Sequence, residues 1–397
     1  MTPAQTFSPL DRRALVAVAL QFFVNGALFA SFIPRLPEIR DRVGISVAGV
    51  GLLLSIAGAS GLIASAAVGT VITRFGTRRV MLVSGTLVSV SLAVVGLATS
   101  PIILLIGLTG MLSFDVPVDV AMNMQGSWLS ARRRAPVMNR LHGLWSLGAA
   151  IGGILSSRIA AVGVPLSVHL VGAGAVLLAI VSYVSRGLLR VDEEHERHEP
   201  AVDGATAPTP AGRGPRPVLF LFLLGGLFAL AIESTSIDWA AFRFTDDFAT
   251  SAAFAALGYV AVTVGMTIGR FAGDHALVRL GARRLEHASL TLTGVGLAAA
   301  TLAPDRHPSL AGYALAGLGF ATMLPGLYDT AAKHPGRTGA GLGALTAGLR
   351  TASLTVPFIV GTLAATSLSV GSAIAVVTLP SVAGFLAVTL ILNFRRP

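Results

Sequence analysis

The sequence predicts an all-α membrane protein with twelve transmembrane helices, arranged as two pseudo-symmetric six-helix bundles. The first observation is composition: 53% of the 397 residues are hydrophobic, 12% are charged, and the mean hydropathy is +0.76. Soluble domains carry about 25% charged residues, so this composition argues against a soluble protein. The other two observations are a series of apolar runs of membrane-spanning length and a basic motif that occurs twice.

The apolar runs fall into two sets of six, and each run is close to or above the ~20 residues that a helix needs to cross a bilayer. The first set covers residues 14–34, 46–72, 79–98, 101–129, 138–162 and 165–185. The second set covers residues 217–241, 251–272, 285–303, 309–332, 338–366 and 370–393. We therefore expect an N-terminal bundle in residues 1–188 and a C-terminal bundle in residues 217–397. Residues 189–216 hold an acidic run and a Pro-, Gly- and Ala-rich tail, which predicts a flexible cytoplasmic linker.

The 29 basic residues predict the orientation of the chain. Most are arginines in short loops on the side that also holds both termini, and the positive-inside rule places that side in the cytoplasm. We expect a multi-pass protein of the cytoplasmic membrane, and the pI of about 11.3 then reflects topology and not nucleic-acid binding. Arg12 and Arg13 precede the first run without a cleavage site after it, which predicts a retained helix and not a signal peptide.

A basic motif of the form R-x-G-x-R-R supports the division into two halves. It spans Arg74 to Arg79 after the second run and Arg279 to Arg284 after the eighth, an offset of 279 − 74 = 205 residues. The starts of the first and seventh runs differ by 217 − 14 = 203 residues, which is nearly the same. A parallel repeat of six helices is typical of one large class of secondary transporters.

The chain resembles the major facilitator superfamily over essentially its whole length. Residues 69–79 are similar to the signature loop G-x-x-x-D-R-x-G-R-R of that family, with Thr73 in place of the aspartate. A second copy runs from Gly269 through Asp274 to Arg279. The resemblance implies a twelve-helix transporter whose two loops act in conformational switching. The residues that it implicates are Gly69, Arg74, Gly76, Arg78, Asp274, Arg279, Gly281 and Arg283.

Within this superfamily the chain looks most similar to the fucose-permease-like bacterial branch. Three stretches carry the likeness: residues 119–123 (DVAMN), 141–148 (LHGLWSLG) and 237–240 (IDWA). The resemblance implies that Asp119 is the coupling carboxylate. The aspartate that fucose transporters carry in their first span has no counterpart here, so fucose itself is not implied.

Two carboxylates, Asp115 and Asp119, are the only charged residues in the run from Pro101 to Leu129. Their i, i+4 spacing places them on one helix face, which Asn123 extends by another turn. A charged group at mid-membrane is costly and is usually functional. We expect the pair to carry a coupled proton, while hydrogen bonding between helices is the structural alternative.

Three further groups of polar residues lie within predicted spans. His142 and Trp145, one turn apart, are suited to proton relay and to ring stacking, although loop contacts and interfacial anchoring would explain them equally well. Gln21 and Asn25 in the first run and Tyr328 in the tenth suit hydroxyl recognition. Ordinary interhelical hydrogen bonds are the alternative for all three.

Arg350 lies about 12 residues into its run, roughly 18 Å along the helix at 1.5 Å per residue. A cation at that depth needs a negative partner. The candidates are Glu233, which is itself deep enough to act in coupling, one of the acids at 115 and 119, or an anionic substrate. A purely structural pair of Arg350 with Glu233 is the alternative to a functional role.

No catalytic constellation is recognisable. The chain has no cysteine, its single lysine, Lys333, belongs to no phosphate-binding loop, and no cofactor or metal site is predicted. We therefore predict a proton-coupled secondary transporter of a small polar solute, such as a sugar-like compound, which works as a monomer by alternating access. A drug–proton antiporter is the first alternative, and a non-transporting membrane receptor or scaffold is the second.

Overall fold

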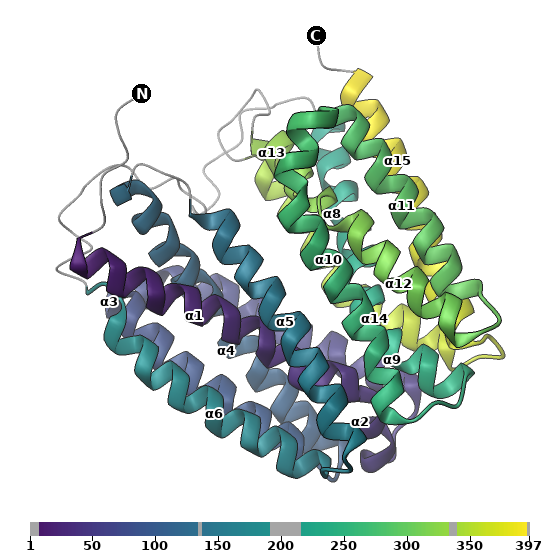
Figure 1. Cartoon of the computed structure of the whole chain (residues 1–397), viewed down its shortest axis with the longest axis horizontal. Helices are drawn as coiled ribbons and strands as arrows, with labels where there is room; N and C mark the ends of the chain where they lie inside the picture. The colour runs from purple at the N-terminus through teal and green to yellow at the C-terminus, as the bar shows by residue number, and fades with distance from the viewer. Residues whose placement is uncertain (1–7, 134–136, 191–215, 333–339, 395–397) are drawn as a thin grey trace. The chain divides into compact units, whose positions relative to one another are not determined.

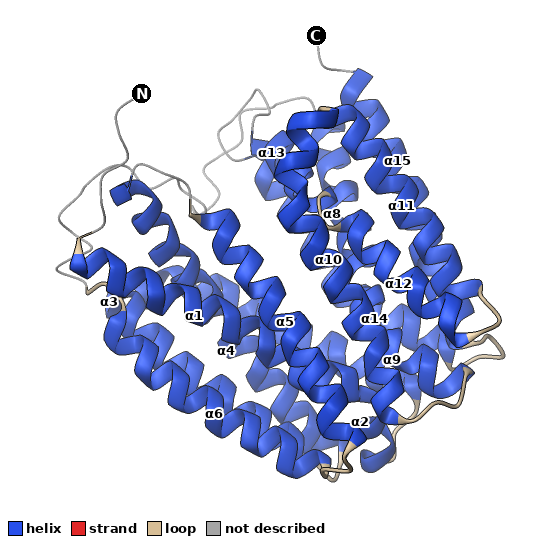
Figure 2. Ribbon diagram, in the orientation of Figure 1, coloured by secondary structure: helices blue, strands red, loops and turns tan. Residues whose placement is uncertain are grey.

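The computed structural model describes residues 8–133, 137–190, 216–332 and 340–394, and within these ranges every regular element is a helix (Figure 2). The N-terminal half contains α1 (Pro9–Phe32), α2 (Leu36–Val43), α3 (Val47–Leu97), α4 (Pro101–Arg133), α5 (Met138–Ala161) and α6 (Leu166–Gly187). The C-terminal half contains α8 (Arg216–Asp238), α9 (Ala240–Phe242), α10 (Ala252–Leu280), α11 (Ala282–Leu302), α12 (Arg306–Phe320), α13 (Met323–Ala332), α14 (Ala340–Ala364) and α15 (Val370–Phe394) (Figure 1).

The prediction of twelve membrane helices is confirmed, with two of them joined end to end. Ten segments of the described chain are long and apolar enough to span a membrane. One of these, α3, is 51 residues long and is interrupted by non-helical angles at Gly76, so it supplies two spans. The remaining span is α11, whose 21 residues include Glu286 and His287 and are therefore less apolar than the other helices.

The chain separates into two compact units. One comprises Met1–Ile45 and Ile56–Glu199, and the other comprises Ser46–Ser55 and Pro200–Pro397. Most of the predicted linker, including its acidic run, lies outside the described residues. The predicted boundaries at 188/189 and 216/217 therefore stay a prediction.

The basic motif adopts the same backbone conformation in both units. Gly76 has φ 74° and ψ 153°, and Gly281 has φ 77° and ψ 158°. These angles are essentially restricted to glycine, because a Cβ atom would clash with the backbone. The repeat in sequence is thus a repeat of a sharp turn between two spans. The other residues predicted for these loops lie around the turns: Gly69, Arg74, Arg279 and Arg283 are exposed, Arg78 is half-buried, and the side chain of Asp274 lies outside the described set.

A buried arginine follows the first helix of the N-terminal unit. Arg35 is 3% exposed and donates hydrogen bonds to both carboxylate oxygens of Glu38, at 2.7 and 2.8 Å. It also donates to the backbone carbonyl of Val164 at 3.3 Å, in the turn that precedes α6. Arg35 therefore ties the end of the first helix to the start of the sixth.

Arg243 follows α8 and repeats this arrangement in the C-terminal unit. It is 5% exposed, pairs with Asp247, and donates to the carbonyl of Ala303 at 2.7 Å. Asp247 in turn accepts from two backbone N–H groups at the start of α15, at 3.0 and 2.8 Å. The two arginines are 243 − 35 = 208 residues apart, close to the 205-residue offset of the basic motif. This second duplication was not predicted from the sequence.

Helices α1 and α5 approach each other closely, and two glycines make this possible (Figure 1). A Cβ atom on Gly26 would lie 2.0 Å from the carbonyl oxygen of Trp145, and one on Gly148 would lie 1.9 Å from that of Phe23. Small residues at such crossings are typical of membrane helices, where the packing of backbones replaces hydrophobic collapse. The crossing brings the middle of α1 against the first half of α5.

We expect Gly148→Ala to lower the free energy of unfolding by about 1–3 kcal/mol, because the new methyl group would force the two helices apart. The matched control is Gly172→Ala on exposed α6, where a Cβ atom would meet nothing within 4 Å. Thermal unfolding of the detergent-solubilised variants measures the difference. Equal stability of the two variants would contradict this account of the crossing.

Candidate functional site

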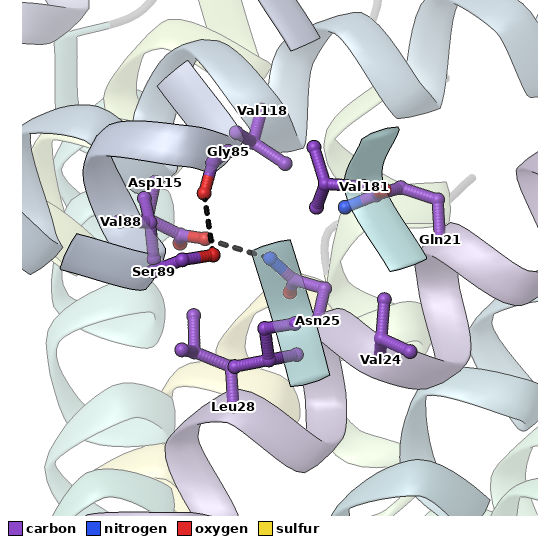
Figure 3. A pocket seen from close by; sticks show the side chains of 11 residues that line it. Gln21, Val24, Asn25, Leu28, Gly85, Val88, Ser89, Asp115, Val118 and Val181 are labelled. Carbon is purple, nitrogen blue, oxygen red and sulfur yellow. Dashed lines mark hydrogen bonds between the residues drawn. The ribbon is translucent and has the colours of Figure 1, made fainter. Parts of the chain in front are cut away.

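Three of the residues predicted from different helices meet in one chain of hydrogen bonds. The side-chain amide of Asn25 on α1 donates from Nδ2 to Oδ1 of Asp115 on α4, at 2.7 Å (Figure 3). The indole Nε1 of Trp145 on α5 donates to Oδ1 of Asn25, at 2.8 Å. Asn25 is 5% exposed and Trp145 is half-buried. The chain therefore joins a partly accessible aromatic ring to a carboxylate inside the N-terminal unit.

The indole determines how the amide of Asn25 is oriented. An indole nitrogen can only donate a hydrogen bond, so the oxygen of the amide must face it. The amide nitrogen then faces Asp115 and can only donate to it. Trp145 thus controls, through one intervening side chain, which kind of hydrogen bond Asp115 receives.

A cavity of about 20 Å³ lies beside Asp115 and has room for about one water molecule. Gln21, Asn25, Ser89 and Asp115 line it together with apolar side chains (Figure 3). Gln21 is 2% exposed, and its Oε1 accepts no hydrogen bond from any described group of the protein. Ser89 donates to the carbonyl of Gly85 at 2.8 Å. The cavity therefore adjoins polar side chains to which a water molecule could hydrogen-bond.

Asp119 lies one turn beyond Asp115 but in a different environment. Its side chain is exposed, whereas that of Asp115 is half-buried against α1. Asn123 donates from Nδ2 to Oδ1 of Asp119 at 3.1 Å and to its backbone carbonyl at 2.8 Å. The predicted stripe of three polar residues is thus present, with one acid turned inward and the other accessible.

His142 is exposed one turn before Trp145, and its ring meets that of Phe22 edge-on at 5.2 Å between centroids. Tyr328 lies on α13 of the C-terminal unit and is 38% exposed. Among the described residues, no group of three or more His, Asp or Glu side chains could hold a metal ion.

One buried polar contact on α4 was missed by the sequence analysis. Gln125 is fully buried and donates from Nε2 to the hydroxyl of Thr77 at 2.9 Å and to the carbonyl of Leu189 at 3.1 Å. It joins the turn at Gly76 to the end of α6. An amide within the apolar run 101–129 was the available signal, but it lies away from the stripe of Asp115 and Asp119.

Of the three candidate partners of Arg350, Glu233 is wrong. Glu233 on α8 pairs instead with Arg270 on α10, at 3.5 Å between Oε1 and Nη2. The two side chains are 17% and 22% exposed, so the pair is largely shielded from solvent. The guanidinium of Arg350 is half-buried on α14 and forms no ion pair within the described residues of its own unit. Arg270 is also within a span, and its position on the helix next to α8 brings it to Glu233.

A double-mutant cycle distinguishes the two possible partners of Glu233. We expect Glu233→Gln and Arg270→Gln to couple by about 0.5–3 kcal/mol in the free energy of unfolding, because each change leaves the other charge without its partner. Glu233→Gln and Arg350→Gln should add within about 0.5 kcal/mol. Thermal unfolding in detergent measures both cycles, and coupling only in the second would restore the pair with Arg350.

Comparison with known proteins places this architecture in a family. The sequence profile described as the Major Facilitator Superfamily matches residues 18–243. An uncharacterised MFS-type transporter of Yersinia pestis is 26% identical over 316 residues, which are 80% of this chain and 79% of that protein. The membrane protein MosC of Rhizobium meliloti is 27% identical over 328 residues, which are 82% of this chain and 77% of that protein.

Solved structures show the same fold. The nucleoside transporter NupG superposes with a TM-score of 0.69 at 13% identity, over 98% of this chain and 100% of that one. A bacterial homologue of the human lysosomal transporter Spinster, in an inward-facing and unoccupied conformation, gives 0.66 at 16% identity, over 98% and 97% of the two chains. Because the family profile also matches more than half of the sequence, the chain belongs to the Major Facilitator Superfamily.

Proposed function

We propose that this membrane transporter moves a small polar, sugar-like solute together with protons by alternating access. The observation that carries the proposal is the run of hydrogen bonds from Trp145 through Asn25 to Asp115. A carboxylate in the membrane interior is costly, and here no cation neutralises it among the described residues; a neutral amide contacts it instead. Such a group can gain and lose a proton without breaking an ion pair. The location that we propose is the cytoplasmic membrane, with both termini inside and one chain as the working unit.

The two acids of α4 have different proposed roles. Asp119 is exposed, so water in a solute path can deliver a proton to it, and its position matches the coupling acid of the fucose-permease-like branch. Asp115 lies one turn away and binds the proton deeper in the bundle. His142 and Glu233 are proposed to assist in proton transfer. The turns at Gly76 and Gly281 are proposed to change conformation as access alternates.

Within the N-terminal unit, Trp145 and Asn123 are the residues proposed to contact the solute. Tyr328 and Arg350 are the solute contacts proposed for the C-terminal unit, taken by itself. Trp145 offers a partly accessible aromatic face on which a sugar or nucleoside ring can stack. Gln21 and Asn25 are buried, so we propose that they hold Asp115 and its cavity and that they contribute to solute recognition only through these neighbours.

Proton movement in membrane vesicles tests the proposal. With a pH-sensitive dye in inside-out vesicles, we expect neutral sugars or nucleosides to evoke a proton flux that empty-vector vesicles lack. The reason is that a symporter cannot move its solute without its proton. A flux evoked only by lipophilic cations would identify a drug antiporter, and no flux with any solute would favour a receptor or scaffold.

Asp119→Asn tests the coupling acid once a solute is known. The amide keeps the shape and hydrogen bonding of the side chain but cannot bind and release a proton. We expect loss of accumulation against a gradient, while exchange of labelled solute across the membrane continues because it needs no net proton release. Asp41→Asn, at an exposed acid of α2 that pairs with Arg40 at 2.8 Å, is the matched control. Full accumulation by Asp119→Asn in vesicles with an imposed pH difference would falsify the assignment.

A further inference from the structure

The hydrogen bonds of Asn25 allow two arrangements of the site. In the arrangement that the structure shows, the indole of Trp145 donates to Oδ1 of Asn25, and Nδ2 of Asn25 donates to Asp115. This arrangement suits an ionised carboxylate, which can only accept hydrogen bonds.

The second arrangement becomes available when the indole N–H leaves Asn25. The amide oxygen then has no donor, and the amide can turn so that Oδ1 faces Asp115. Only a protonated carboxyl group can donate to that oxygen. Whether the indole donates to Asn25 and whether Asp115 is protonated are therefore linked through the single amide of Asn25.

A polar solute is suited to take the indole hydrogen bond of Trp145 away from Asn25. Trp145 is half-buried, whereas Asn25 is 5% exposed, so a solute reaches the ring before it reaches the amide. A hydroxyl or carbonyl oxygen of a solute stacked on the ring can accept the indole hydrogen bond in place of Asn25.

We propose that Trp145 and Asn25 couple solute binding to protonation of Asp115, so that solute and proton are bound together and move in the same direction. This inference rests on the proposed transport function and adds to it the contacts through which solute binding and protonation are coupled. One proton passes from a hydronium ion in the adjoining cavity to a carboxylate oxygen of Asp115: an O–H bond of the hydronium ion breaks, an O–H bond forms on Asp115, and a neutral water molecule remains. By linkage the effect is reciprocal, so protonation of Asp115 must also weaken the contact of Trp145 with Asn25.

Among the described residues of the N-terminal unit, few other titratable groups lie near this hydrogen-bond chain. Asp119 lies one turn away on α4, and His142 lies one turn away on α5. The cavity-lining residues contributed by α3 and α6 are Gly85, Val88 and Ser89, and Leu177 and Val181, none of which titrates. Asp119 and His142 are thus the two groups that an experiment must separate from Asp115.

The reciprocal effect can be measured without a solute or a membrane gradient. The full chain is labelled with 5-fluorotryptophan, and its three tryptophans, Trp128, Trp145 and Trp239, give ¹⁹F resonances that Trp145→Phe assigns. We expect the Trp145 resonance to move reversibly as a change of pH alters the protonation of Asp115. The movement should be absent in Asp115→Asn and in Asn25→Ala, and it should persist in Asp119→Asn and His142→Gln.

The other two resonances show whether each variant is folded, because Trp239 is 1% exposed and Trp128 is half-buried on α4. If Asp115→Asn does not fold, Asn25→Ala carries the same test. The proposal is overturned if the Trp145 resonance is independent of pH in the unmodified chain, if its movement survives Asp115→Asn or Asn25→Ala, or if it disappears with His142→Gln. A vesicle assay without proton flux would leave this measurement unaffected, so the failures of the two proposals are distinguishable.

Discussion

The hydrogen bond from Asn25 to Asp115 is the interaction on which the rest of the site depends. A carboxylate in the hydrocarbon region costs at least about 2.5–3.5 kcal/mol, and proteins usually offset this with a cation. In the described part of this unit the contact is a neutral amide, and a small cavity lined by both polar and apolar side chains adjoins it. A salt bridge would hold the acid ionised, whereas an amide accommodates both protonation states. Asp115 is thus suited to proton exchange, because its contact is a neutral amide and not a cation.

The close crossing of α1 and α5 makes this contact possible. Gly26 and Gly148 let the two backbones meet, and the same crossing places the indole of Trp145 on the amide of Asn25. The glycines that allow the close approach, Gly26 and Gly148, therefore lie within one helical turn of Asn25 and Trp145, which form the hydrogen bond. A side chain at either glycine would act on the site through the separation of the helices, without touching Asp115.

The two units share the same turns and buried arginines but differ in the polar contacts between their helices. The turns at Gly76 and Gly281 and the buried arginines at 35 and 243 recur at offsets of 205 and 208 residues. At the latter offset Asn25 corresponds to Glu233, since 25 + 208 = 233. In the N-terminal unit the residue at this position, Asn25, donates a hydrogen bond to Asp115. In the C-terminal unit the equivalent residue, Glu233, forms an ion pair with Arg270. Equivalent positions of the two units therefore hold an acid in different ways, by a neutral amide in one and by a cation in the other.

The sequence by itself determined the number of spans, the duplication and the polar stripe of α4. Hydropathy and the repeated R-x-G-x-R-R motif are local properties that survive without tertiary contacts, and the i, i+4 spacing of Asp115 and Asp119 follows from helix geometry. Only the tertiary structure decided which polar groups touch. The rotation and crossing of the helices place Asp115 against Asn25 and leave Asp119 exposed. They also bring Glu233 to Arg270 and not to Arg350. Sequence periodicity places a residue on a helix face, but the neighbour of that face depends on how distant helices pack. Asn25 and Asp115, for example, are 90 residues apart in the sequence.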